Sequence, residues 1–177
     1  MHCTLPVRDG VSAVQAEYSG GPEAIRPHLG GEALPAVLDY WERLRGSRRF
    51  PPRSAFDPMA LRAHLAQVYL LDVLPDHVFR YRVVGGAIAD FFGETSPVGL
   101  TPEEVFGATA GIALAPYRLV SAQGCLYMHT ASAVWLYRNR PYVHYSVLLL
   151  PMGESEQRVD KILAIVDFVP EREAPSG

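Results

Sequence analysis

The chain has 177 residues, of which 49% are hydrophobic and 20% are charged, and its formal net charge is -3. This composition is typical of a globular domain, excludes a disordered chain and argues against a broad nucleic-acid-binding surface. The 2 cysteines exclude a disulfide framework and a multi-cysteine zinc site, and no apolar run reaches the roughly 18 residues of a membrane span. We therefore expect a cytoplasmic protein that binds neither nucleic acid nor a membrane.

The sequence divides into three parts. Residues 1–31 are dominated by glycine and proline turn signals and predict an N-terminal extension. Residues 32–169 predict a single folded domain, and residues 170–177 form a short C-terminal tail. The chain leaves no room for an output domain after the folded part, so we expect any output to be made in trans.

The clearest predicted helix covers residues 34–45. Pro35 suits its first turn, and Gly46 suits the position just past its end. Its apolar residues recur at helical spacing and form one continuous stripe: Leu34, Val37, Leu38, Trp41 and Leu44. Such a stripe needs a partner surface, and we expect it on the outer face of the sheet, where it helps to form a homodimer. The alternative is that it covers only the sheet of its own subunit.

The remaining elements follow in a clear order along the chain. Two predicted strands precede short helices and a longer helix, and three strands complete the domain: strands 68–74 and 78–84, helices 87–92 and 108–124, and strands 129–137, 142–150 and 158–169. This order does not alternate as in a parallel βαβ sheet. It predicts an α+β fold with a five-stranded antiparallel sheet, helices packed on one face and an N-terminal flanking helix.

A set of short motifs runs through residues 34–169. They are Tyr40-Trp41-Glu42-Arg43-Leu44-Arg45-Gly46, Asp57-Pro58, Leu71-Asp72-Val73, Phe79-Arg80-Tyr81-Arg82-Val83-Val84-Gly85, Leu148-Leu149-Leu150-Pro151 and Val159-Asp160-Lys161-Ile162-Leu163. Together with the element order, these motifs resemble a bacterial family of PAS-like domains. The resemblance implies a PAS fold and a sensing or protein-interaction role, and it implies no particular ligand.

The resemblance also implies a pocket between the sheet and the helices. Strand parity and helix spacing indicate which aromatic and apolar side chains would line it. The candidate ligand-binding residues are Tyr81, Phe91, Phe92, Tyr117, Leu119, Trp135 and Tyr145.

No cofactor is identifiable from the residues that known PAS cofactors need. A haem-type PAS domain uses a histidine on the helix before the last three strands, and residues 78–128 contain no histidine. A light-oxygen-voltage domain needs a cysteine in a particular helix motif, and Cys125 does not lie in that context. The sequence therefore disfavours b-type haem and a cysteinyl-flavin, and we interpret Cys125 as a buried structural thiol.

Two pairs of side chains allow more than one interpretation. His129 and His144 lie on adjacent predicted strands, where they would form a metal-binding pair or, as we favour, remain separate half-buried histidines. Arg80 and Arg82 lie on the polar face of their strand, where they would clamp a carboxylate ligand or, as we favour, face solvent or form salt bridges.

We expect a stand-alone sensory or signalling domain that binds a small molecule or a protein partner. The alternative is a small α+β pocket enzyme of isomerase or dehydratase type, with His129, His144 and Tyr142 as acid-base groups. No nucleophile elbow, phosphate loop or dinucleotide motif is present, so we do not expect an enzyme. Connectivity separates the two folds, because in a PAS-like sheet we expect the first two strands to sit centrally and to neighbour the last.

Overall fold

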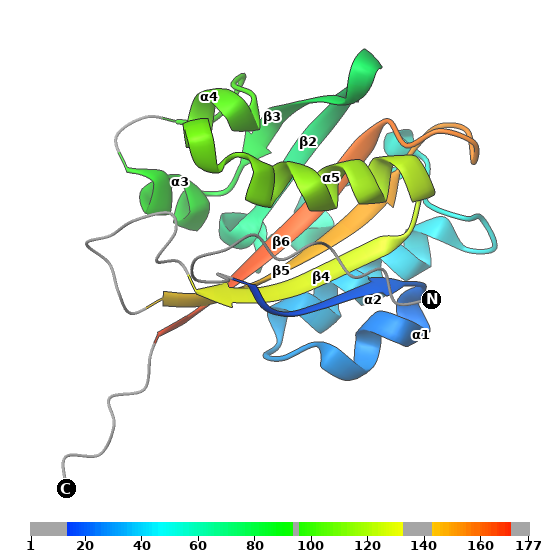
Figure 1. Ribbon diagram of the computed structural model, residues 1–177. Coiled ribbons are helices and arrows are strands. Elements are labelled where there is room, and N and C mark those ends of the chain that lie inside the picture. Colours follow the sequence, from blue (N-terminus) through cyan, green and yellow to red (C-terminus); the bar gives the residue numbers. More distant parts are fainter. Residues whose placement is uncertain (1–13, 94–95, 133–142, 171–177) are drawn as a thin grey trace, which may run out of the picture.

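A six-stranded sheet forms the centre of the computed structural model, which describes residues 14–93, 96–132 and 143–170. Every neighbouring pair of strands runs antiparallel, and the strand order is β1-β4-β5-β6-β2-β3 (Figure 1). The strands are β1 (Val14–Gly20), β2 (Val68–Leu74), β3 (Val78–Val84), β4 (Leu126–Ser132), β5 (Val143–Met152) and β6 (Lys161–Pro170).

The connectivity of the sheet matches the PAS-like expectation at β2 and differs from it at β3. The last strand, β6, pairs with β2, and β2 pairs with β3 at the edge of the sheet. The first of the two early strands, β2, therefore lies inside the sheet beside the last strand, as expected, but β3 lies at the edge, so the expectation that both early strands sit centrally is wrong for β3. The expected α+β class and antiparallel sheet are confirmed.

The sheet has one strand more than the five that the sequence indicates. The additional strand is β1, which pairs with the free edge of β4 and places Glu17 opposite His129. It comes from residues 1–31, where turn signals dominate. Edge strands carry fewer apolar residues than central strands, and the partner of β1 lies more than a hundred residues away in the sequence. Val14, Ala16 and Tyr18 alternate with Gln15, Glu17 and Ser19, which is the period of a strand, but the surrounding turn signals obscure this short pattern.

Three helices cover one face of the sheet, called the inner face below: α3 (Gly86–Phe92), α4 (Pro102–Phe106) and α5 (Gly111–Gln123). A capping box begins α4, because Glu104 Oε2 accepts from the Thr101 amide at 2.8 Å and Thr101 Oγ1 accepts from the Glu104 amide at 3.3 Å. Gly124 ends α5 in the left-handed conformation, with φ of 60°. Figure 1 shows α5 crossing this face.

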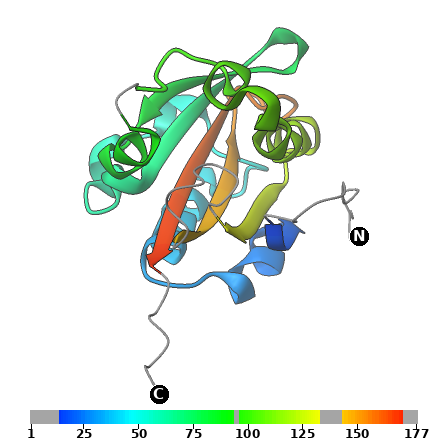
Figure 2. The same ribbon diagram turned by 60° about the vertical axis from the view of Figure 1, so that its left-hand side comes forward.

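The opposite, outer face carries α1 (Pro22–Ile25) and α2 (Ala33–Arg45), so the described part of the chain has helices on both sides of the sheet (Figure 2). Register places Leu148, Leu163 and Ile165 on this face, and all three are buried. Short 3-10 turns connect the elements at Arg26–His28, Arg53–Ala55, Pro58–Leu61, Leu65–Gln67, Pro75–His77 and Gly107–Thr109.

The apolar stripe of α2 is buried within its own subunit. It packs against β5 and β6, as expected for the outer face, and its members Leu34, Val37, Leu38 and Trp41 are at most 1% exposed. Leu44, nearer the end of the helix, is only partly buried. Because the stripe already covers the sheet of one subunit, it offers no surface to a second copy. Homodimerisation stays a prediction, and it cannot rest on this stripe.

Candidate functional site

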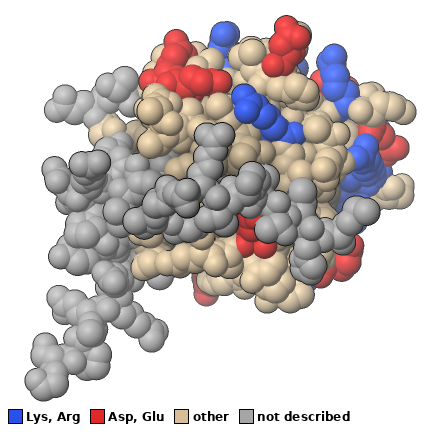
Figure 3. Space-filling view, in the orientation of Figure 1, with Lys and Arg blue, Asp and Glu red and all other residues tan. Residues whose placement is uncertain are grey.

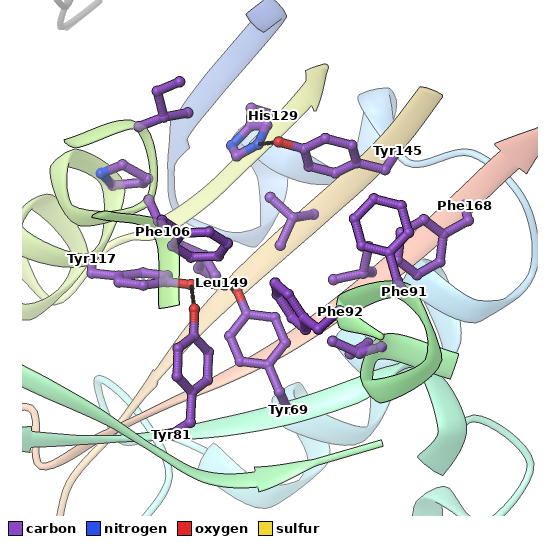
Figure 4. Close-up of a pocket in the computed structure, with 16 residues that line it drawn as sticks. Tyr69, Tyr81, Phe91, Phe92, Phe106, Tyr117, His129, Tyr145, Leu149 and Phe168 are labelled. Carbon is purple, nitrogen blue, oxygen red and sulfur yellow. Dashed lines mark hydrogen bonds between the residues drawn. The ribbon is translucent and has the colours of Figure 1, made fainter. Parts of the chain in front are cut away.

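A cavity of about 70 Å³ lies between the inner face of the sheet and α3, α4 and α5 (Figure 4). Most of its wall is aromatic or aliphatic, and the polar atoms are tyrosine hydroxyls and one imidazole. The described residues that line it are Tyr69, Tyr81, Ile88, Phe91, Phe92, Phe106, Ile112, Ala113, Pro116, Tyr117, His129, Tyr145, Val147, Leu149, Val166 and Phe168. An apolar cavity with a few converging polar groups is the usual form of a small-molecule site.

Most of the candidate ligand residues from the sequence line this cavity: Tyr81, Phe91, Phe92, Tyr117 and Tyr145. Leu119 does not line it and instead packs against the core. It follows Tyr117 by two residues on α5, and each helical residue turns by about 100°, so the two side chains leave the helix on different sides. Trp135 lies outside the described residues.

Several lining residues were not predicted, and the clearest are Tyr69 and Phe168. Tyr69 lies in the continuous apolar run of β2, and its pairing with Ala164 places it on the inner face. Phe168 lies on β6, where both faces of the strand are largely apolar. When both faces of a strand are buried, the sequence does not show which side chains point to which face. His129, which the sequence pointed to for other chemistry, also lines the cavity.

Three tyrosine hydroxyls meet at one end of the cavity. The Tyr69 and Tyr117 hydroxyl oxygens lie 2.9 Å apart, and those of Tyr81 and Tyr117 lie 3.4 Å apart (Figure 4). Burial raises the pKa of all three phenols well above the usual value, because the charged form would be desolvated. All three therefore stay protonated in water near neutral pH and remain hydrogen-bond donors. We call these three residues the tyrosine cluster.

His129 lies at another part of the cavity wall, on β4. Its side chain is buried, its Nε2 lies 3.4 Å from the Tyr145 hydroxyl, and its ring packs edge-on against Tyr127. Its Nδ1 has no hydrogen-bond partner among the described residues. Burial lowers the pKa of His129 to about 4, because no described charge compensates the desolvated imidazolium. The cavity is therefore lined by a neutral imidazole at physiological pH.

The two histidines on the adjacent strands do not form a pair. In β4 and β5, His129 is opposite Val147 and His144 is opposite Ser132, so their side chains lie on different faces of the sheet. His144 Nδ1 accepts from the Gln15 side-chain amide at 3.3 Å. Within residues 14–93, 96–132 and 143–170, no cluster of three or more His, Cys, Asp or Glu is placed to hold a metal ion.

The charged side chains of β3 lie away from the cavity. Arg80 and Arg82 are exposed on the outer face, so neither of them reaches a ligand in the cavity. On the face shown in Figure 3, acidic and basic side chains are interspersed and neither sign gathers into a broad patch. Among the helices that the structure describes, none is long and apolar enough to span a membrane.

We expect His129 to make folding sensitive to pH. Burial lowers its pKa from 6.5 to about 4. Between these two pH values the imidazole is therefore protonated in the unfolded chain and neutral in the folded chain. The free energy of unfolding should therefore fall as the pH drops from 6.5 to about 4, by about 3 kcal/mol at about 1.4 kcal/mol per pKa unit. Urea unfolding of wild type and His129→Gln across this range measures the difference.

The matched control for this prediction is His144→Gln, which changes the less deeply buried histidine on the other face. It should keep the wild-type dependence on pH, whereas His129→Gln should lose much of it. Equal pH dependence in wild type and His129→Gln would contradict the desolvated environment assigned to His129.

The comparison with protein-family models identifies the family of this chain. The family model described as a PAS domain matches residues 31–167. The comparison with curated proteins returned no match. Among solved structures, an RNA-binding light-oxygen-voltage receptor is similar with a TM-score of 0.43 and 14% sequence identity, over 88% of this chain and 38% of that chain. This chain thus spans well under half the length of that receptor. Since the family model covers the flanking helix, every cavity-lining helix and the sheet apart from β1 and the end of β6, the chain belongs to the PAS domain family.

Proposed function

We propose that this PAS domain is a sensor that binds a small molecule in the cavity between the sheet and α5. The observation that carries the proposal is the cavity itself. It has an apolar wall and a volume of about 70 Å³, and it is lined by the tyrosine cluster and by a neutral histidine with an unpartnered Nδ1. Each buried polar atom without a hydrogen-bond partner lowers the stability of the fold by about 1–3 kcal/mol. Such atoms in the cavity wall therefore favour a binding role over packing alone.

Binding suits these residues better than catalysis does. The acid-base candidates for the alternative enzyme are His129, His144 and Tyr142. His129 and His144 lie on different faces of the sheet, and Tyr142 lies outside the described residues. No described carboxylate lines the cavity to act with His129. We therefore propose a binding role for the cavity, with output through a protein partner.

Arg49 connects the cavity-lining helix α5 to the segment that follows the outer helix α2. Through this connection, a ligand that displaces α5 would also alter the structure next to the outer face. Its guanidinium donates to the Gln123 carbonyl at the end of α5, and its Nη1 donates to the Glu156 carbonyl at 3.5 Å. Its backbone amide donates to Glu156 Oε1 at 3.1 Å. Arg49 follows α2 in the chain, so one side chain connects the cavity-lining helix, the loop between β5 and β6, and the segment after the outer helix. A displacement of α5 by a ligand would strain these contacts.

Hydrogen exchange with and without a probe tests this proposal. We expect each of two small neutral molecules, butanone and 2-methyl-1-butene (called 2-methylbutene below), to slow amide hydrogen exchange in α5. Each should also change amide hydrogen exchange in residues 46–53 and 153–157. Ala113→Leu is the matched control, because Ala113 lines the cavity from α5 and the larger side chain fills the space. The variant should show no response to either probe.

Arg49→Gln separates binding from transmission. It should bind the probes and keep the slowed exchange in α5, but lose the response in residues 153–157. Absence of any probe effect on wild type, or the same effect in Ala113→Leu, would reject the cavity as the sensing site.

A further inference from the structure

The tyrosine cluster has three hydroxyl protons but only two hydrogen bonds between its members. Tyr69, Tyr81 and Tyr117 carry one hydroxyl proton each, and their mutual contacts of 2.9 Å and 3.4 Å use two of the three. Within the described part of the chain these hydroxyls have no other hydrogen-bond partner. Whichever way the hydroxyls are oriented, one phenolic O–H is left without an acceptor among residues 14–93, 96–132 and 143–170.

The remaining proton lies where a ligand can reach it. All three tyrosines line the cavity, and their hydroxyls point toward one another (Figure 4). A buried hydroxyl with no acceptor costs about 1–3 kcal/mol. A molecule that brings an acceptor oxygen into the cavity recovers this cost, whereas a hydrocarbon of the same shape does not.

The rest of the wall restricts the charge and size of the ligand. None of the described residues lining the cavity is Asp, Glu, Lys or Arg. A charged ligand would lose its hydration without gaining a counter-ion, which costs far more than burying a neutral polar group. The volume of about 70 Å³ compares with about 10–15 Å³ for a single water in the same measure, so the space suits a molecule of only a few non-hydrogen atoms.

We propose that the ligand is a small neutral molecule with a hydrogen-bond acceptor, such as a short ketone, whose oxygen accepts the remaining proton of the tyrosine cluster. This inference rests on the proposed sensing function and specifies the chemical class that the cavity takes. The ring faces and edges around the cavity also favour a compact and largely apolar body around that acceptor.

Three probes of the same size and branching test the inference. Butanone carries an acceptor oxygen, 2-methylbutene has a carbon in its place, and propanoate carries a charge. Saturation-transfer NMR should show butanone and 2-methylbutene binding to the wild type. It should show no binding of propanoate at concentrations where butanone saturates.

The variant Tyr69→Phe/Tyr81→Phe/Tyr117→Phe removes every donor of the tyrosine cluster and keeps the rings. Removing hydrogen-bonded partners together leaves no orphaned group, so folding should be little affected. We expect butanone affinity to fall by about 3- to 10-fold, as expected for one net hydrogen bond. The affinity for 2-methylbutene should stay equal or rise. Tyr145→Phe, which removes a hydroxyl elsewhere in the cavity, should keep the wild-type preference between the two probes.

The outcomes separate this inference from the proposed function. If neither neutral probe binds the wild type, the sensing proposal itself fails. If both probes bind but the triple variant changes both affinities equally, the hydroxyls of the tyrosine cluster do not recognise the acceptor oxygen, and the inference is overturned. If propanoate competes with butanone, the cavity accepts a charged ligand, and the inference is overturned as well. The comparison of the three probes on wild type needs no variant, so it decides the charge selectivity even if the triple variant does not fold.

Discussion

Trp41→Ala should lower the free energy of unfolding by about 3–5 kcal/mol, the range found when a large aromatic side chain is removed from a core. Trp41 is 1% exposed between α2 and the outer face, so truncation leaves a cavity that the sheet cannot fill. Its indole Nε1 also donates to the Pro151 carbonyl at 2.8 Å, and this bond ties the helix to β5. Urea unfolding measures the loss.

Trp41→Phe is the matched control for this result. It keeps an aromatic ring against the sheet but leaves the Pro151 carbonyl without its donor, so its cost should be smaller, at about 1–3 kcal/mol. A cost below about 1 kcal/mol for Trp41→Ala would contradict the burial of the stripe within one subunit, since a buried tryptophan cannot be removed so cheaply.

Asp72→Ala should destabilise the fold by a similar amount, about 3–5 kcal/mol. Lys161 is the single lysine of the chain and is only 8% exposed. Its ammonium forms an ion pair with Asp72, which lies directly opposite it where β2 pairs with β6 on the outer face. Removing the carboxylate leaves a largely buried positive charge without its partner. Thermal or urea unfolding measures the effect.

The double variant Asp72→Ala/Lys161→Met separates the pair from the backbone around it. Without the ammonium no charge is left uncompensated, and the methionine keeps the apolar length of the lysine stem. The double variant should therefore recover much of the stability that Asp72→Ala loses. If it were as unstable as the single variant or less stable, the ion pair could not be the cause.

The sequence predicts best those elements in which only one face is apolar. The structure gives β2 and β3 the predicted bounds, and in β3 Phe79 and Tyr81 are buried while Arg80 and Arg82 are exposed. The helix predicted over residues 34–45 begins only one residue earlier, as α2 (Ala33–Arg45). In β3 and α2 a strong contrast between a polar and an apolar face marks the period of the element. β2 is a continuous apolar run, and its end is marked instead by the turn residues Pro75 and Asp76.

The sequence gives less information where both faces are buried or where pairing is distant. Tyr69 and Phe168 lie in runs without a polar face, so their position on the cavity wall follows only from the register of the sheet. The edge strand β1 depends on its pairing with β4, which lies more than a hundred residues away along the chain. The tyrosine cluster joins residues of β2, β3 and α5, and no spacing along the chain brings these three hydroxyls together.

A crystal structure of the protein soaked with butanone tests the central claim most directly. The account predicts density for the probe between the inner face of the sheet and α5, with its oxygen within hydrogen-bond distance of a hydroxyl of the tyrosine cluster. Ala113→Leu crystals treated in the same way should show no such density. An unoccupied cavity at saturating butanone, or a probe bound only at the protein surface, would contradict the account.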